Sequence, residues 1–179
     1  MTDIQATEKI PAAPSECLLA KEPISGVRES IRFTPMEYRI NKLQIRLAKE
    51  KDKQQILQYD GHIHPDRVGQ CIQNGFVYVL CDGEKIVGIL RYNLFWQTIP
   101  FLDLLFIDEA CRGQGWGSRM MAHWEDAMLQ AGYPHVMLST QEDETAKFFY
   151  EKIGYRRIGA FLPPEQEAEE IMYLKELTP

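Results

Sequence analysis

The sequence has no apolar run that approaches the ~20 residues of a membrane-spanning helix. Its N-terminus also lacks the basic segment followed by an apolar segment that is typical of a secretory signal. The few cysteines, Cys17, Cys71, Cys81 and Cys111, form no CxxC pair and show no metal-ligand spacing. We therefore expect a cytoplasmic protein with reduced thiols, without a membrane helix and without a metal site.

Positive charge is scarce as well. The chain carries 20 Lys and Arg residues against 26 Asp and Glu residues, which gives a net charge of −6. This balance argues against nucleic acid or an anionic membrane surface as the main partner. With 179 residues, 45% of them hydrophobic, the chain is long enough for one packed core and short for two.

The first part of the chain differs from the rest in composition. Residues 1–35 are mostly polar, contain four prolines and have one modest apolar cluster at 17–19. Such a segment buries little apolar surface, so we predict a flexible N-terminal extension over residues 1–40. Residues 41–179 are then predicted to form the single folded domain.

The most informative stretch joins a strand, a glycine-rich loop and a helix. Residues 101–107 are a short apolar run that suits a buried strand, and the loop 112–118 has glycine at alternate positions. Apolar residues at helical spacing from Met120 to Met128 predict a helix that ends at Gly132. Alternate glycines let backbone N–H groups converge, and a helix N-terminus adds partial positive charge. The pattern therefore favours a phosphate-binding loop over a simple tight turn.

Two common nucleotide-binding motifs do not fit this loop. A Walker loop would continue with lysine, whereas Ser118 and Arg119 follow Gly117. A dinucleotide fingerprint that began at Gly113 would need glycine where Ser118 stands. Both readings are disfavoured.

The remaining pattern predicts a mostly antiparallel sheet. Strands are expected over residues 38–49, 76–81, 86–95, 135–140, 155–161 and 171–177, with two short helices inside 52–74 and another over 145–153 capped by Thr145. Asp82 and Gly83 are typical of a tight hairpin turn. The strand at 135–140 follows the central helix after a short connection, which predicts a parallel crossover next to the strand at 101–107.

At this point the residues resemble a known family. Arg112, Gly115 and Gly117 after an apolar strand resemble the Arg/Gln-x-x-Gly-x-Gly/Ala signature of the GNAT superfamily of acyl-CoA-dependent N-acyltransferases. Residues 146–155, Ala-Lys-Phe-Phe-Tyr-Glu-Lys-Ile-Gly-Tyr, resemble that family's helix-to-strand segment. The resemblance covers roughly residues 41–177. It implies an α/β (α+β) fold whose mixed, mostly antiparallel sheet of roughly six to seven strands has a splayed parallel pair and about four flanking helices.

The resemblance also implies an activity and a donor. It predicts an N-acetyltransferase that moves an acetyl group from acetyl-CoA, the co-substrate, to a primary amine of a small molecule or peptide, directly in a ternary complex. A non-catalytic acyl-CoA-binding sensor or regulatory domain is the alternative. Homodimers are frequent in the family, so the resemblance implies that the protein could form a homodimer. The expected donor-binding residues are Phe106, Ile107, Arg112, Gly113, Gln114, Gly115, Trp116, Gly117 and Ser118.

Some of these residues have alternative readings. Main-chain groups of Phe106 and Ile107 would contact the thioester and pantetheine, and Arg112 would either contact phosphate or brace the loop. The family often has asparagine near the start of the later helix, whereas this chain has an acidic trio at 142–144, which puts some pantetheine contacts in doubt. Cys111 could carry an acyl group, but direct transfer is the family's usual route.

Two residues are candidates for proton transfer. Tyr150 stands where the family's general acid stands, and a phenol with a pKa of ~10 can protonate a leaving thiolate. Asp103 is the one charged residue in its apolar strand, and alternation places it on the same face as Leu105 and Ile107. Such a site raises the pKa of a carboxylate, so we predict that Asp103 is the general base. The alternative for Asp103 is a structural carboxylate paired with Arg91 or Tyr92 of the neighbouring strand.

The acceptor side is the least determined by sequence. His62 and His64 are alternative bases, although a His-x-His-Pro turn is more typical of cap or surface residues. Trp96, His62 and Phe161 are predicted to contact the acceptor, because aromatic side chains near carboxylates suit an amine cation. The glutamates at 165–170 could also line the acceptor side, but such a run is more typical of a solvated loop.

Overall fold

The computed structural model describes residues 43–164 and 166–178. The predicted N-terminal extension, residues 1–40, and the start of the predicted first strand lie outside these residues.

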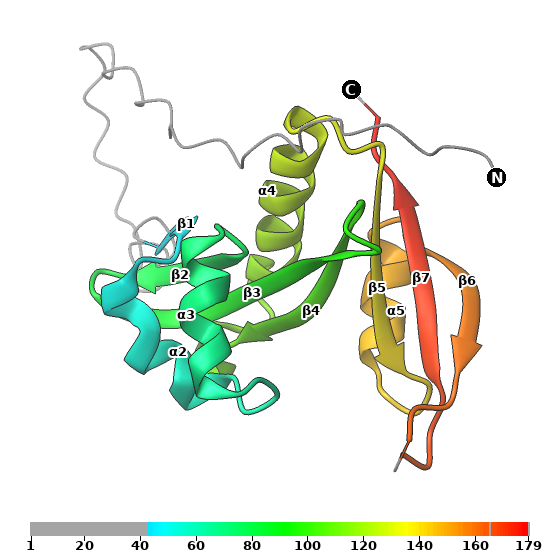
Figure 1. Cartoon of the computed structure of the whole chain (residues 1–179), viewed down its shortest axis with the longest axis horizontal. Coiled ribbons are helices and arrows are strands. Elements are labelled where there is room, and N and C mark those ends of the chain that lie inside the picture. The colour runs from blue at the N-terminus through cyan, green and yellow to red at the C-terminus, as the bar shows by residue number, and fades with distance from the viewer. Residues whose placement is uncertain (1–42, 165, 179) are drawn as a thin grey trace, which may run out of the picture.

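The described residues form a seven-stranded sheet in the order β1-β2-β3-β4-β5-β7-β6. Its strands are β1 (Leu43–Leu47), β2 (Val77–Asp82), β3 (Lys85–Phe95), β4 (Ile99–Ile107), β5 (His135–Gln141), β6 (Arg156–Phe161) and β7 (Glu170–Glu176). The α-helices among these residues are α2 (Lys53–Tyr59), α3 (Pro65–Gln73), α4 (Trp116–Gln130) and α5 (Ala146–Lys152), with 3-10 turns η1 (Glu50–Asp52) and η2 (Glu109–Cys111). Every predicted strand and helix is present in this part of the chain (Figure 1).

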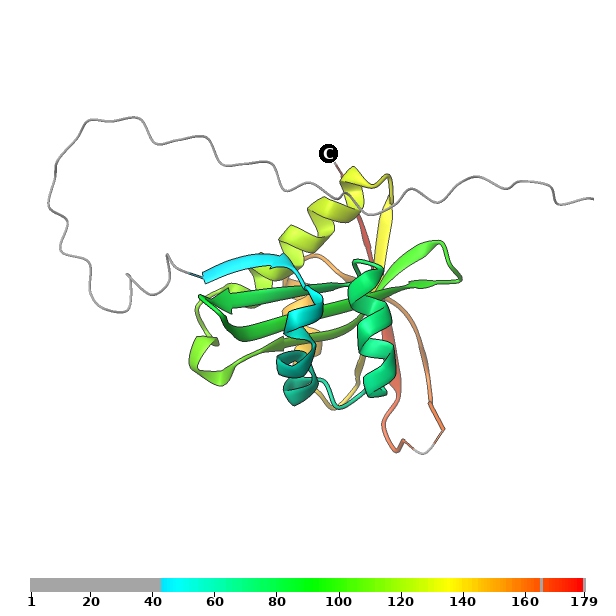
Figure 2. The same cartoon turned by 60° about the vertical axis from the view of Figure 1, so that its left-hand side comes forward.

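The two faces of the sheet are covered by different helices. Figure 2 shows α4 above strands β1–β4, and α2 and α3 below them. On the α4 face, one core cluster includes the fully buried Trp124, Leu90 and Leu138. On the other face, Ile56 of α2 and Val68 of α3 pack with Ile89 in a second cluster. The sheet therefore has a buried core on each side.

Helix α4 confirms the predicted apolar spacing. Met120, Met121, Trp124 and Met128 are all at most 2% exposed. The helix begins at Trp116, somewhat earlier than the end of the glycine loop, and Gly132 follows its end with φ of 89°. A left-handed residue after the last turn stops a helix and favours glycine, as predicted. Thr145 precedes α5 as predicted, but its side chain makes no capping hydrogen bond.

Strand β4 contains a bulge that re-aims one residue. Arg91 of β3 pairs with Leu104 and Tyr92 pairs with Leu102, so Asp103 is the extra residue between them. The bulge interrupts the alternation of side chains along β4. Leu105 packs against the α4-side cluster, whereas Asp103 bonds Arg91, whose guanidinium also contacts the end of α2. The predicted shared face of Asp103 with Leu105 and Ile107 is therefore wrong, because a strict two-residue period does not cross a bulge.

Strands β4 and β5 form the parallel pair, as predicted, and separate after a short contact. Their register consists of Phe101 with Met137 and Leu102 with Leu138. Beyond Leu102, β5 continues to pair with β7 on its other side and diverges from β4 (Figure 1). The main chain of β4 from Asp103 to Ile107 is therefore left without a β5 neighbour.

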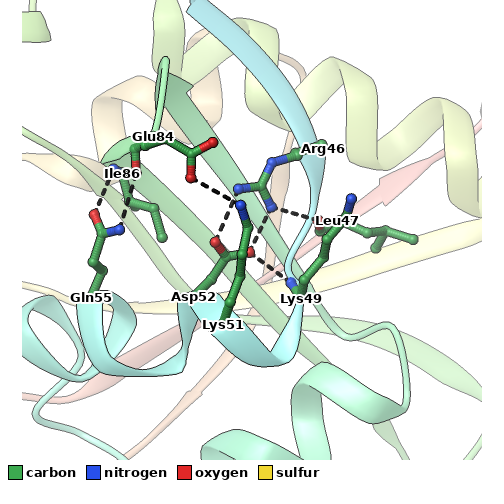
Figure 3. Close-up of polar contacts among 8 residues, drawn as sticks. All are labelled: Arg46, Leu47, Lys49, Lys51, Asp52, Gln55, Glu84 and Ile86. Atoms are coloured by element: carbon green, nitrogen blue, oxygen red, sulfur yellow. Dashed lines mark hydrogen bonds and ion pairs between the residues drawn. The ribbon is translucent and has the colours of Figure 1, made fainter.

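A polar network fixes the start of α2 to the sheet (Figure 3). Arg46 of β1 donates two hydrogen bonds, of 2.6 and 3.0 Å, to the carboxylate of Asp52, which also accepts the Lys49 N–H at 2.7 Å. Gln55 on α2 bonds the main chain of the β2–β3 turn at Glu84 and Ile86. These contacts hold the first turn of α2 in place on the edge of the sheet.

Candidate active site

A cleft of about 600 Å³ opens beside the separated strands. This volume is typical of small-molecule and cofactor sites. The end of β4, the glycine-rich loop, the first turn of α4 and one face of α5 line the cleft. Its lining residues are Leu105, Phe106, Ile107, Cys111, Arg112, Gly113, Gly115, Trp116, Gly117, Ser118, Ala146, Phe149, Tyr150 and Lys152. The predicted donor-binding residues, apart from Gln114, therefore lie together in one cleft.

The glycine-rich loop is built to bring its backbone close to a ligand. Gly113 and Gly115 have φ of 72° and 80°, and a Cβ on either would meet nothing within 4 Å. Gly115 is the N-cap of α4 and no side chain caps this helix start. The N–H groups of its first turn, at 116–118, therefore remain available at the positive end of the helix. Open backbone and positive charge fit an anionic group such as a pyrophosphate.

Arg112 braces the loop. Its Nε donates a 2.8 Å hydrogen bond to the Ile107 carbonyl oxygen, and its guanidinium lies 5.9 Å from the centre of the Phe106 ring. Of the two predicted roles, loop bracing is therefore present in this structure. Gln114 is outside the cleft lining and donates to the Ala110 carbonyl at 3.1 Å.

The starts of α4 and α5 approach each other across the cleft. A Cβ on Gly117 would lie 3.4 Å from the Phe149 ring, which is contact distance, so the two helices meet closely at this point. On α5, Ala146, Phe149 and Tyr150 share one helical face toward the cleft. Ala146 and Phe149 were absent from the predicted site, although their spacing from Tyr150 could have indicated them.

Tyr150 is 8% exposed and lines the cleft. Burial raises the pKa of its phenol above the ordinary value, and the nearby charge of Glu144 raises it further. Glu144 itself is held by the Thr140 hydroxyl, which donates to its carboxylate at 2.7 Å. The Tyr150 phenol therefore stays protonated throughout the neutral pH range and can serve as a proton donor.

Asp103 lies away from the cleft lining, in a separate polar cluster. Its carboxylate accepts a 2.7 Å bond from Arg91 Nη1 and a 2.5 Å bond from Asn93 Nδ2. Burial raises the pKa of Asp103 to about 6, against the opposing effects of Arg91 and Asn93. The carboxylate is therefore paired with Arg91, as the structural reading of this residue anticipated, and also has a pKa suited to proton transfer near neutrality.

Sequence reasoning missed Asp60 as a member of this cluster. Its Oδ2 accepts a 2.7 Å bond from Arg91 Nε. Asp60 and Arg91 are 31 positions apart, and no local pattern indicates such a pair. Only the packing of α2 on the sheet brings Asp60 to Arg91.

The predicted acceptor residues lie at separate places outside the cleft lining. Trp96 is 80% exposed at the β3–β4 turn, and Phe161 is 49% exposed at the end of β6. His62 is exposed on the loop between α2 and α3, where its N–H donates to Asp60 Oδ1 at 3.2 Å. His64 is the N-cap of α3 and its ring accepts from the Asp66 N–H, which fits its interpretation as a cap residue.

Between residues 43 and 164 and from 166 to 178, no cluster of His, Cys, Asp or Glu is arranged to hold a metal ion. None of the helices in these ranges is both long and apolar enough to span a membrane.

Comparison with solved structures identifies the fold. Ard1 from Thermoplasma volcanium is 18% identical, with a TM-score of 0.67 over 77% of this chain and 99% of that one. A Bacillus anthracis str. Ames structure in complex with acetyl coenzyme A is 21% identical, with a TM-score of 0.52 over 57% of this chain and 62% of its own. At such identities, these likenesses show a shared fold.

Sequence comparison identifies the family. Blasticidin-S acetyltransferase from Streptomyces morookaense is 33% identical over 87 residues, which are 48% of this chain. The chain spans only 62% of the length of that curated relative. The model of the Acetyltransferase (GNAT) family matches residues 42–155, which include the glycine-rich loop, Asp103 and Tyr150. The chain therefore belongs to the GNAT acetyltransferase family.

Proposed function

We propose that this protein transfers an acetyl group from acetyl-CoA to a primary amine of a small molecule or peptide, directly in a ternary complex. The observation that carries the proposal is the cleft in which the glycine-rich loop, the unpaired edge of β4 and Tyr150 meet. Family membership supports acetyl-CoA as the donor.

The donor would be held mainly by backbone groups. The N–H groups at 113–118 are suited to the pyrophosphate, and Arg112 keeps the loop against the end of β4. The β4 main chain after Leu102 has no β5 neighbour and can therefore pair with an extended ligand chain, with a main-chain N–H near Ile107 polarising the thioester carbonyl. The side chain of Phe106 is free for packing, and its ring stacks on Tyr59 at 4.9 Å.

Tyr150 and Asp103 would divide the proton transfers between them. The acceptor enters as an ammonium group, which has no lone pair for attack. Asp103 accepts one of its protons, directly or through water, and leaves a neutral amine. The neutral amine nitrogen then bonds the thioester carbonyl carbon and loses its second proton to water, and the carbon–sulfur bond breaks. Tyr150 donates its phenolic proton to the leaving sulfur and recovers a proton from solvent. The products are the acetylated amine and the free thiol.

The proposed acid and the proposed base lie in different surroundings. Tyr150 lies with the donor cleft, whereas Asp103 contacts groups from β3 and the α2 end. An acceptor that enters from the α2–α3 side would meet Asp103 there. We keep Trp96, His62 and Phe161 as proposed acceptor contacts, of which His62 lies on the α2–α3 loop. A homodimer likewise remains a prediction, to be tested by light scattering on the purified protein.

The acceptor class follows from the same reasoning and from one relative. The proposed acetyl transfer requires only a nucleophilic amine, and the Streptomyces morookaense relative is named for acetylation of blasticidin S. Blasticidin S therefore belongs in a first panel of acceptors, together with simple amines, aminoglycosides and short peptides.

Binding and turnover test the proposal separately. A thermal unfolding scan with acetyl-CoA should raise Tm, whereas NAD and ATP should not; a hundredfold excess over Kd adds about 2.7 kcal/mol of stability. Thiol release with the amine panel, checked by mass spectrometry of the product, should then identify an acceptor. Absence of binding would overturn the donor assignment. Binding without turnover across the panel would favour the non-catalytic sensor.

A further inference from the structure

The polar cluster around Asp103 is a chain of three charged side chains. Arg91 Nε contacts Asp60 Oδ2 at 2.7 Å, and Arg91 Nη1 contacts Asp103 Oδ2 at 2.7 Å. One guanidinium therefore bridges two carboxylates from different elements, the end of α2 and the bulge of β4. The three side chains are 0%, 8% and 19% exposed, for Asp60, Arg91 and Asp103 respectively.

Asp60 is almost fully buried, and both of its carboxylate oxygens accept hydrogen bonds. A charged carboxylate loses its hydration when buried, and it is retained at a net benefit only with good partners. Asp60 has Arg91 on one oxygen and the His62 N–H, at 3.2 Å, on the other. It thus connects the α2–α3 loop to the guanidinium that holds Asp103.

The charge balance of the cluster couples the two carboxylates. Arg91 attracts both Asp60 and Asp103, and the two like charges repel each other. Cys71 from α3 interacts electrostatically with all three groups. Burial raises the pKa of its thiol, so Cys71 contributes no negative charge at neutral pH. Asn93 from β3 adds an uncharged donor. Without the negative charge of Asp60, the Arg91 guanidinium would form an ion pair with Asp103 alone.

We infer that Asp60 is a positioning residue, which acts through Arg91 on the orientation and charge of the Asp103 carboxylate. This inference rests on the proposed role of Asp103 as the base. Asp60 touches neither the cleft nor the reacting atoms, and its effect passes through the shared guanidinium.

The chain offers a matched control for a purely structural role. Asp52 is an equally buried carboxylate at the opposite end of α2, and it is paired with Arg46 (Figure 3). Its guanidinium partner contacts no second carboxylate among the described residues. An Asp52→Asn variant should therefore lose stability without any effect on Asp103.

The test measures the titration of Asp103 itself. In Asp60→Asn, the carboxyl carbon of Asp103, followed by NMR, should titrate at least about half a pH unit lower than in the wild type. The acidic limb of the pH–rate profile should move by the same amount. Asn93→Ala should move the titration the opposite way, because a donor to the charged form is lost. Asp52→Asn should leave it unchanged.

A second variant keeps the test decisive if Asp60→Asn does not fold. Arg91→Lys retains the positive charge but cannot present two fixed donors to two carboxylates, so the Asp103 titration should move upward. An unchanged titration in Asp60→Asn, or in Arg91→Lys in its place, would overturn the inference. A wild-type pH–rate profile in Asp103→Asn would instead overturn the base assignment, and the NMR titration would still decide the role of Asp60.

Discussion

The Nε atom of Arg112 donates a 2.8 Å hydrogen bond to the carbonyl oxygen of Ile107. The bond joins the first residue of the glycine-rich loop to the last residue of β4. It fixes the loop relative to the unpaired edge of β4, which borders the same cleft. Arg112 therefore holds the loop in shape beside the cleft where we propose that the donor binds.

Arg112→Ala should weaken acetyl-CoA binding. Loss of one hydrogen bond from a charged, exposed donor costs about 1 kcal/mol, which corresponds to a roughly fivefold higher Kd. Titration calorimetry with acetyl-CoA measures the change. Arg67→Ala is the control, because Arg67 is exposed on α3 and its loss changes the net charge equally. Equal Kd values in the two variants would remove Arg112 from the site.

Tyr150→Phe should abolish most turnover while donor binding persists. Loss of a positioned general acid typically lowers kcat by about 10²- to 10⁴-fold. The phenylalanine ring keeps the packing against Phe149 and Tyr155. Steady-state kinetics with a saturating amine would measure kcat, and calorimetry would check that the Kd for acetyl-CoA is unchanged.

Tyr155→Phe serves as the matched control for this variant. Tyr155 is equally buried, but its hydroxyl donates to Glu125 at 2.9 Å and lies outside the cleft lining. Its loss should reduce stability by about 1 kcal/mol and leave kcat nearly constant. Comparable losses of kcat in the two variants would indicate a packing effect and sink the acid assignment of Tyr150.

Activity should rise with pH through the titration of Asp103. A base must be deprotonated to accept a proton, and burial raises the pKa of this carboxyl to about 6. The rate at low acceptor concentration should therefore fall below about pH 6 in the wild type. Asp103→Asn should have a lower kcat and lack this acidic limb. Retention of the limb in the variant would assign it to another group.

The sequence predicted the elements of this fold much better than the contacts among charged residues. Short runs of β-forming apolar residues and the turn at Gly83 determine β2 and β3 locally, and the spacing from Met120 to Met128 determines α4. The glycine-rich loop and Tyr150 belong to motifs that are local in the chain, so the donor cleft was predictable as well. The bulge at Asp103 was not, because it arises from the register between β3 and β4.

The same limit explains the acceptor side. Asp60 reaches Arg91 across 31 positions, and the pair depends on how α2 packs on the sheet. Trp96 and Phe161 were predicted from residue type alone; Trp96 lies in the β3–β4 turn and Phe161 at the end of β6, both away from the cleft lining. Long-range pairs of this kind carry no signature in a single sequence.

The Asp52–Arg46 pair should make stability fall in acid. The Arg46 hydrogen bonds hold the pKa of Asp52 below its usual range, with the Lys49 N–H in support. A carboxylate with a lowered folded pKa stabilises the protein above its unfolded pKa, and this contribution disappears as pH falls through the folded pKa. Asp52→Asn should therefore cost about 2 kcal/mol at pH 7 and less near pH 3, which is below the ordinary pKa of an aspartate. Urea unfolding at both pH values measures the difference; an equal cost at both would contradict an ionic role.

Gly115→Ala should damage both the fold and the donor site. Gly115 has φ of 80°, and a residue with a Cβ in this left-handed region costs about 1–2 kcal/mol. For a domain of this size, that cost corresponds to a decrease in Tm of about 2–8 °C. The first N–H groups of α4 would also turn away from the cleft, so the Kd for acetyl-CoA should rise more than the loss of stability alone explains.

Gly159→Ala separates the backbone effect from the mere addition of a methyl group. Gly159 lies on the edge strand β6, where a Cβ meets nothing within 4 Å and φ is not positive. This variant should stay within about 0.5 kcal/mol of the wild type and bind acetyl-CoA normally. If Gly115→Ala matched Gly159→Ala in both Tm and Kd, the left-handed turn would have no part in donor binding. The converse result would tie the affinity for acetyl-CoA to the backbone conformation at the start of α4.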